Sequence, residues 1–246
     1  MGKGAKHYGK QPNQHYDTRP VIHVDYCFIQ SEQNGLHITV LTVVDVATGM
    51  TLAAVVESKG VNDYAVNELL RFTQEVGRGG GVLQPGTVQS DQEAAIRALL
   101  RVVANKAGMS LRHSPVYVNK AHASVERWHG TLWQHCRTFK GSIKESYDID
   151  IDVTTPLMCW NVKHTSWVHN RFRLHDDGKT SYERRWGTAC CKPLCEFAES
   201  ILLQYAFVPD RPKTTTTWDF GIWLGRCWWT SSWCGHLGWN GNGSGR

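Results

Sequence analysis

The chain has 246 residues and a mass of 27.8 kDa, which is enough for one large domain or for one domain and a small module. With 41% hydrophobic and 20% charged residues it can bury a core, and this composition excludes a membrane protein, a coiled coil and a collagen-like chain. The net charge is +5; residues 1–20 and 127–246 are basic, whereas residues 21–126 are slightly acidic. This pattern fits a carboxylate site between surfaces that attract a polyanion, and it equally fits ordinary solvated charge.

Tryptophan and cysteine are distributed unevenly along the chain. All 11 Trp lie between Trp128 and Trp239, and seven of the 8 Cys lie beyond residue 130. Residues 1–6 have neither the apolar stretch of a signal peptide nor the myristoylation pattern. We therefore expect an intracellular, reducing setting, in which the cysteines are free thiols.

For the first half of the chain, the sequence pattern predicts three strands followed by alternating helices and strands. Residues 1–20 are expected to be a flexible basic lead-in. Strands are predicted over 21–29, 37–46 and 50–57, and the turn residues between them indicate an antiparallel meander.

A helix capped by Asn62 and ending at Gly77 is predicted next, and a strand follows over 87–89. Ser90 and Glu93 have the spacing of a capping box, which predicts a helix over 94–107. A fifth strand is predicted over 109–116. The order of elements is typical of a mixed α/β domain.

The second half begins with a strong helix over 124–139, where the apolar residues form one stripe. Another helix is predicted over 154–174 and a short β module over 199–223. Beyond Arg226 the chain is rich in Trp, Gly, Asn and Ser, and this tail is expected to be disordered.

Three acids lie at informative positions of this pattern. Asp25 falls inside the first strand, Asp91 at the end of the fourth strand, and Glu126 in the first turn of the strong helix. Singly, each has an ordinary structural explanation, such as an edge-strand acid or a charge at a helix start. Together they are a way for a mixed fold to bring three carboxylates to one sheet edge, where hard oxygen ligands suit Mg²⁺ or Mn²⁺.

At these residues the sequence resembles the catalytic core of retroviral and retrotransposon integrases, within the transposases that use an Asp, Asp, Glu triad. The resemblance covers roughly residues 20–140, and the spacing of 34 residues between Asp91 and Glu126 fits it. It is carried by Val24-Asp25-Tyr26, Leu41-Thr42-Val43-Val44-Asp45, Gln89-Ser90-Asp91 and Ser124-Val125-Glu126-Arg127-Trp128-His129-Gly130-Thr131-Leu132. A weaker likeness continues through 178–183 and 220–225. Ala123 stands where the family usually has Gly.

The resemblance implies a ribonuclease-H-like fold, with a mixed five-stranded sheet flanked by helices and a small C-terminal β module. It divides the chain into the lead-in 1–20, an integrase-like core 21–175, a β-rich module 176–226 and the tail 227–246. It implies DNA integration by metal-dependent strand transfer, with two Mg²⁺ or Mn²⁺ ions held by Asp25, Asp91 and Glu126. Contacts to DNA phosphate are then expected from Lys120, Arg127, His129 and Arg137.

The implied partners are the DNA ends of an element, target DNA and further copies of the chain, with no membrane, and an active copy would work in the nucleus. Two alternatives stay open: an inactive nucleic-acid-binding remnant of an integrase, and a metal-dependent nuclease of the ribonuclease H type. Asp45 and Glu93 are rival carboxylates, expected instead to end a strand and to serve the capping box. A zinc site built from the late cysteines, Cys190, Cys191, Cys195, Cys227 and Cys234, is disfavoured because their spacing is not that of structural zinc.

Overall fold

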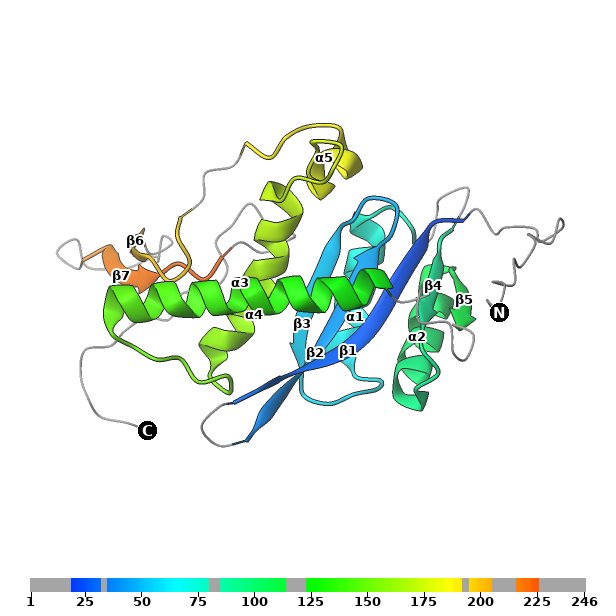
Figure 1. The fold of residues 1–246 in the computed structure, drawn as a ribbon, viewed down its shortest axis with the longest axis horizontal. Coiled ribbons are helices and arrows are strands. Elements are labelled where there is room, and N and C mark those ends of the chain that lie inside the picture. Colours follow the sequence, from blue (N-terminus) through cyan, green and yellow to red (C-terminus); the bar gives the residue numbers. More distant parts are fainter. Residues whose placement is uncertain are drawn as a thin grey trace, which may run out of the picture.

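The computed structural model describes residues 19–31, 35–79, 85–113, 123–191, 195–204 and 216–225. Most of the expected lead-in and the whole Trp-rich tail lie outside these residues. Within them, five strands form one mixed sheet in the order β3-β2-β1-β4-β5 (Figure 1). The strands are β1 (Val21–Gln30), β2 (His37–Asp45), β3 (Thr51–Val56), β4 (Thr87–Ser90) and β5 (Ser110–His113).

The sheet joins an antiparallel half to a parallel half at β1. The β1–β2 and β2–β3 pairs are antiparallel, which confirms the predicted meander, whereas β4 pairs with β1 and β5 in parallel. Helical crossovers connect the parallel strands, as such pairs require. The fold is therefore the predicted mixed α/β sheet with flanking helices.

Two helices cover one face of the sheet. They are α1 (Asp63–Glu75) and α2 (Ala94–Ala107), and their apolar stripes pack against alternate residues of β1 and β2 in one hydrophobic cluster. Asn62 caps α1 as predicted, because its side-chain Oδ1 accepts a hydrogen bond from the Ala65 amide at 2.8 Å. The predicted capping box of α2 is wrong: Glu93 occupies the N-cap without a side-chain cap bond, and the Ser90 hydroxyl donates to the Asp91 carbonyl instead.

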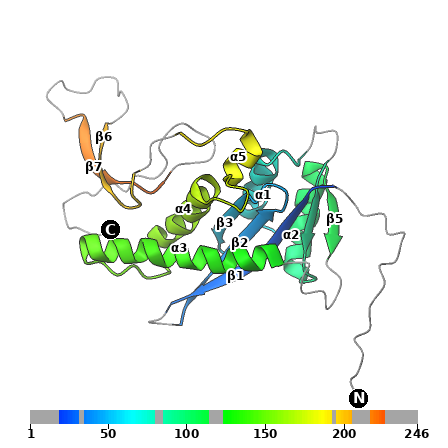
Figure 2. The same ribbon diagram turned by 45° about the horizontal axis from the view of Figure 1, so that its top comes forward.

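The opposite face is covered by α3 (Ala123–Tyr147) and α4 (Pro156–Phe172). The long helix α3 lies across β1 and β2 and extends beyond the sheet toward the C-terminal strands (Figures 1 and 2). It is eight residues longer than the predicted helix at its C-terminal end, because contacts from the distant segment 196–200 support that part. The Tyr147 hydroxyl donates to the Ala198 carbonyl at 2.9 Å, and Phe139 packs on Phe197.

The C-terminal part adds a short helix and a hairpin. Helix α5 (Ser181–Trp186) packs on α4, and β6 (Ser200–Gln204) pairs antiparallel with β7 (Trp218–Ile222) as the small β module. Phe197, Ala198 and Leu224 contribute to the same hydrophobic cluster as α3 and α4. None of the described helices is long and apolar enough to cross a bilayer.

Candidate active site

Asp25 lies in the middle of β1, on the face of the sheet that α3 covers. Its neighbours Val24 and Tyr26 point into the cluster under α1 and α2, so the alternation of a strand turns Asp25 the other way. Its Oδ1 accepts a hydrogen bond from the Tyr26 amide at 2.8 Å, and its carbonyl accepts one from the Thr42 hydroxyl at 3.0 Å. The side chain is only partly buried, which leaves the carboxylate accessible from solvent.

Asp91 directly follows β4, the strand that pairs in parallel with β1. The paired residues end at His23 and Gln89, and a continued register would bring Asp91 level with Asp25. Neighbouring strands are about 4.8 Å apart, and the shared alternation turns both carboxylates to the α3 face. Oδ1 of Asp91 accepts a hydrogen bond from the Glu93 amide at 3.1 Å, which holds the turn that follows β4.

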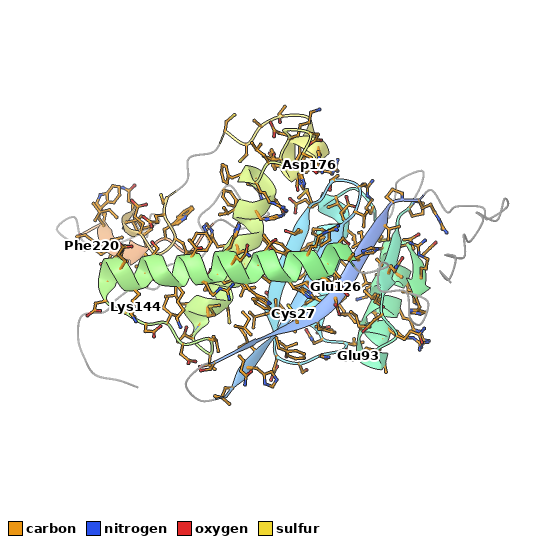
Figure 3. All side chains as sticks on the ribbon, viewed as in Figure 1. Cys27, Glu93, Glu126, Lys144, Asp176 and Phe220 are labelled. Carbon is orange, nitrogen blue, oxygen red and sulfur yellow. The ribbon has the colours of Figure 1, made fainter. Side chains whose placement is uncertain are left out.

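Glu126 lies in the first turn of α3, where its charge is favoured by the helix dipole. With 100° of rotation per residue, it shares a stripe with Trp133 and Arg137, the flank of α3 that faces β1. Its side chain is exposed, and no described residue forms a hydrogen bond or an ion pair with its carboxylate. Figure 3 shows it at the end of α3 that lies over the sheet.

Two hydrogen bonds fix the N-terminal half of α3 on the strands that carry this site. Nδ1 of His23 lies 2.5 Å from the hydroxyl of Ser124, and Nε2 of His129 lies 2.7 Å from that of Thr42, the cross-strand neighbour of Asp25. Glu126 lies between these two anchors along the helix. The three predicted carboxylates therefore belong to elements that meet on one face of the sheet.

Burial lowers the pKa of His129 to about 4, so its ring is neutral at neutral pH. A neutral ring bound to Thr42 holds the helix in place, and it lacks the positive charge of a phosphate ligand. A phosphate contact of His129 stays a prediction, and it would come from a neutral ring. Arg127 and Arg137 are both exposed, point about 80° apart around α3 and line different hollows of the surface, and Lys120 lies outside the described residues.

A lysine that the sequence analysis missed connects the two strand carboxylates indirectly. Nζ of Lys59 binds both carboxylate oxygens of Glu93, at 2.9 and 2.8 Å, and lies over the rings of Tyr26 and Phe28. Glu93 follows Asp91 by two residues, and Tyr26 follows Asp25 directly. Lys59 therefore ties the segment of one carboxylate to the segment of the other. The partners are 34 residues apart, and no local pattern marks such a pair.

The rival carboxylate Asp45 is fully buried and has a structural role. It ends β2, as predicted, and its two oxygens form an ion pair with Arg78 at 3.1 and 3.2 Å. The same carboxylate accepts hydrogen bonds from the amide and the hydroxyl of Thr48. Both oxygens of Asp45 are thus engaged in bonds that hold the turn between β2 and β3 and the side chain of Arg78.

The donor set of the candidate site fits a hard divalent cation, because it consists of carboxylate oxygens alone. Asp25 lies in β1, and Asp91 directly follows β4, the strand paired with β1. As the side chains stand, the residues that the structure describes contain no group of three His, Cys, Asp or Glu side chains close enough to hold a metal ion. Glu126 would therefore have to turn toward the strands to complete the site. The described cysteines likewise form no such group.

The fold is similar to solved structures of retroviral integrases. A chain of the simian T-cell lymphotropic virus intasome in complex with PP2A regulatory subunit B56 gamma matches 90% of this chain over 73% of its own length, with 13% identity and a TM-score of 0.53. The HTLV-2 integrase catalytic core domain in complex with magnesium matches 67% of this chain over 95% of its own, with 14% identity and a TM-score of 0.46. The BIV integrase catalytic core domain matches 68% of this chain over 93% of its own, with 17% identity and a TM-score of 0.47.

No protein-family model and no curated protein matches the chain. At these identities the likeness to the viral structures is one of fold. The mixed five-stranded sheet with its flanking helices is thus the ribonuclease-H-like fold of retroviral integrase catalytic cores.

Proposed function

We propose that this chain is an integrase-like polynucleotidyl transferase that joins DNA strands by metal-dependent transesterification. The observation that supports the proposal is the parallel pairing of β1, which carries Asp25, with β4, which Asp91 follows directly. Glu126 is in the first turn of α3, which lies across β1 and β2. Three carboxylates from three elements form a set of oxygen ligands for divalent ions, which supports metal-dependent chemistry on a phosphodiester.

In this proposal Asp25, Asp91 and Glu126 hold two Mg²⁺ or Mn²⁺ ions, which supply Lewis acidity for an in-line displacement at phosphorus. The two aspartates are fixed by the sheet, whereas Glu126 turns inward from the helix. Arg137 on the same flank and Lys120 before the helix would contact DNA phosphates. No covalent enzyme intermediate is needed, because a 3′-hydroxyl or water attacks the phosphodiester directly.

The resemblance also suggests further parts of the proposal. Element ends and target DNA are the substrates, several copies of the chain act together, and an active copy works in the nucleus. The core would span residues 21–175 and the β-rich module 176–226, between the lead-in and the tail.

A strand-transfer assay tests the proposal. The protein is incubated with a pool of duplexes that end in a free 3′-hydroxyl, a plasmid target, and Mg²⁺ or Mn²⁺. Joined products are expected from the native chain, and Asp91→Asn or Glu126→Gln should reduce them at least about 10³-fold. Glu145→Gln, an exposed acid at the far end of α3, is the matched control and should keep full activity.

Two other results would contradict the proposal and would support the nuclease or the inactive remnant instead. Metal-dependent cutting without joining would assign the nuclease function. DNA binding that is equal with and without metal, with no cut or joined product, would assign the inactive remnant.

A further inference from the structure

A cleft of about 700 Å³ lies along the flank of α3 that carries Arg127, Thr131 and Gln134. Its walls come from the N-terminal half of α3, from the turn between β2 and β3, from the end of α4, and from the segment leading into α5. Figure 3 shows Asp176 of this segment on one side of α3 and Glu93 on the other. None of Asp25, Asp91 and Glu126 lines the cleft, and the proposed reaction does not use it.

The floor and the far wall of the cleft are held in place by packing. Gly49 has a φ of +76°, and a Cβ at that position would meet the ring of His175 at 2.7 Å, so the turn packs closely on this histidine. Nε2 of His175 lies 2.8 Å from the hydroxyl of Ser181. Arg184 is held by an ion pair with Asp177 at 2.8 Å. The shape of the cleft therefore does not depend on a ligand.

Positive charge lines this cleft on both sides. Arg127 lies on the α3 wall and Arg173 on the opposite wall, and both side chains are exposed. Asp177 balances the charge of Arg184, so the acid Asp176 is outnumbered by the two exposed guanidinium groups.

The histidines of the cleft add no charge at neutral pH. Burial lowers the pKa of His175 and brings that of His169 to about 3, and nearby arginines act in the same direction. The ligand that fits is an anion whose oxygen atoms can contact Arg127 on one wall and Arg173 on the other, as successive phosphates of a chain can. Gly130 faces open space on this flank, so the ligand can approach the helix backbone there.

We propose that this cleft binds the phosphodiester backbone of a second DNA segment, distinct from the segment that reaches Asp25, Asp91 and Glu126. The inference rests on the proposed function, because strand transfer requires two DNA segments at once. Helix α3 then forms a ridge between them, with Arg137 on the flank of the carboxylates and Arg127 on the flank of the cleft.

DNA binding without metal tests this site independently of catalysis. The anisotropy of a labelled 20-base-pair duplex is measured in EDTA over a series of NaCl concentrations. Arg127→Gln combined with Arg173→Gln should weaken binding about 10-fold at 0.1 M salt and lower the slope of log K against log salt by about 2. The matched control combines Arg101→Gln with Lys106→Gln, which removes the same charge from α2 on the other face of the sheet, and should change affinity less than about 2-fold.

A second variant guards against a loss of folding. Arg127→Lys combined with Arg173→Lys keeps the charge, and this variant should retain most of the native affinity and all of the native salt slope. Equal affinity of the glutamine variant and the control would overturn the proposal. So would displacement of the DNA by polyglutamate at the same charge concentration, since that would assign the cleft to acidic protein. Asp91→Asn should bind the duplex like the native chain, so a failure of strand transfer leaves this result intact.

Discussion

The two faces of the five-stranded sheet have different interiors. Under α1 and α2 the buried side chains are mostly apolar, although α1 also buries Glu68 and Thr73. The face under α3 and α4 also has an apolar cluster, but α4 buries polar side chains within it, among them Asn161, His164, Thr165, Ser166, His169 and Asn170. Both proposed sites lie on this second face. The comparison indicates that apolar packing stabilises the first face. On the second face, buried polar groups fix the positions of α3 and α4 at some cost in the free energy of folding.

Truncating a core residue on the apolar face should have the largest effect on stability. Leu99 of α2 is fully buried, and Leu99→Ala should lower the free energy of unfolding by about 3–4 kcal/mol, because it removes methyl groups and leaves a cavity. Chemical denaturation monitored by circular dichroism measures the change. Leu202→Ala, at a leucine that is 60% exposed, is the control and should change stability by less than about 0.5 kcal/mol. Equal losses for the two variants would contradict this description of the core.

On the face under α3 and α4, removing a buried hydrogen-bonding side chain should lower the free energy of unfolding nearly as much as Leu99→Ala does. Asn170 is fully buried, accepts hydrogen bonds from the amide and the hydroxyl of Thr51, and donates to the Thr51 carbonyl at 2.8 Å. Asn170→Ala leaves these β3 groups unpaired and should lower the free energy of unfolding by about 2–3 kcal/mol. Thr138→Ala, on an exposed part of α3, is the comparison and should be nearly neutral. A neutral Asn170→Ala would show that α4 is held by apolar packing alone.

Acid should destabilise the polar face selectively. Burial among aromatic rings lowers the pKa of His164 to about 4, below the value of about 6.5 in an unfolded chain. Because the unfolded chain binds the proton more readily, this histidine lowers the stability as the pH falls from 6.5 through 4, by about 2–3 kcal/mol in total.

His164→Gln should therefore lose less stability between pH 7 and pH 4 than the native chain, as measured by urea unfolding at each pH. His37, an exposed histidine on β2, serves as the control through His37→Gln. An unchanged pH profile in His164→Gln would contradict the assignment of acid sensitivity to this face.

Lys59 should influence activity more than stability. Lys59→Met keeps the aliphatic stem but removes the ion pair with Glu93, and so loosens the turn that carries Asp91. We expect about a 10-fold loss of strand transfer, a higher Mg²⁺ concentration at half-maximal activity, and a change in stability within about 1 kcal/mol. Lys59→Arg should restore most of the activity, and an equal loss in both variants would show that the charge has no positioning role.

Much of the fold followed from local patterns. The helix predicted over 94–107 has both ends where the structure has them, and the turn between β2 and β3 lies at Thr48 and Gly49 as predicted. These features depend on residues close in sequence, so periodicity and turn chemistry were sufficient. Helix α5 was not predicted, although Thr180 and Glu183 form the capping box that begins it.

The arrangement of the candidate site required tertiary information. The sequence indicated that Asp25 lies in a strand and Asp91 at a strand end, but that these two strands are neighbours depends on the pairing of β1 with β4. The link between Lys59 and Glu93 and the bond between Thr42 and His129 each join residues far apart in the chain. For the same reason the capping-box prediction for Glu93 was wrong, since a distant lysine binds its carboxylate.

Binding of Mn²⁺ is the most direct test of the central claim that Asp25, Asp91 and Glu126 form one cation site. The ion is titrated into the metal-free protein, and the free ion is followed by electron paramagnetic resonance, which requires no DNA and no activity. We predict saturable binding to the native chain, at least about 10-fold weaker binding in Asp91→Asn and Glu126→Gln, and native binding in Glu145→Gln. Native affinity in Glu126→Gln would contradict the claim, since it would show that α3 does not contribute its carboxylate to the ion.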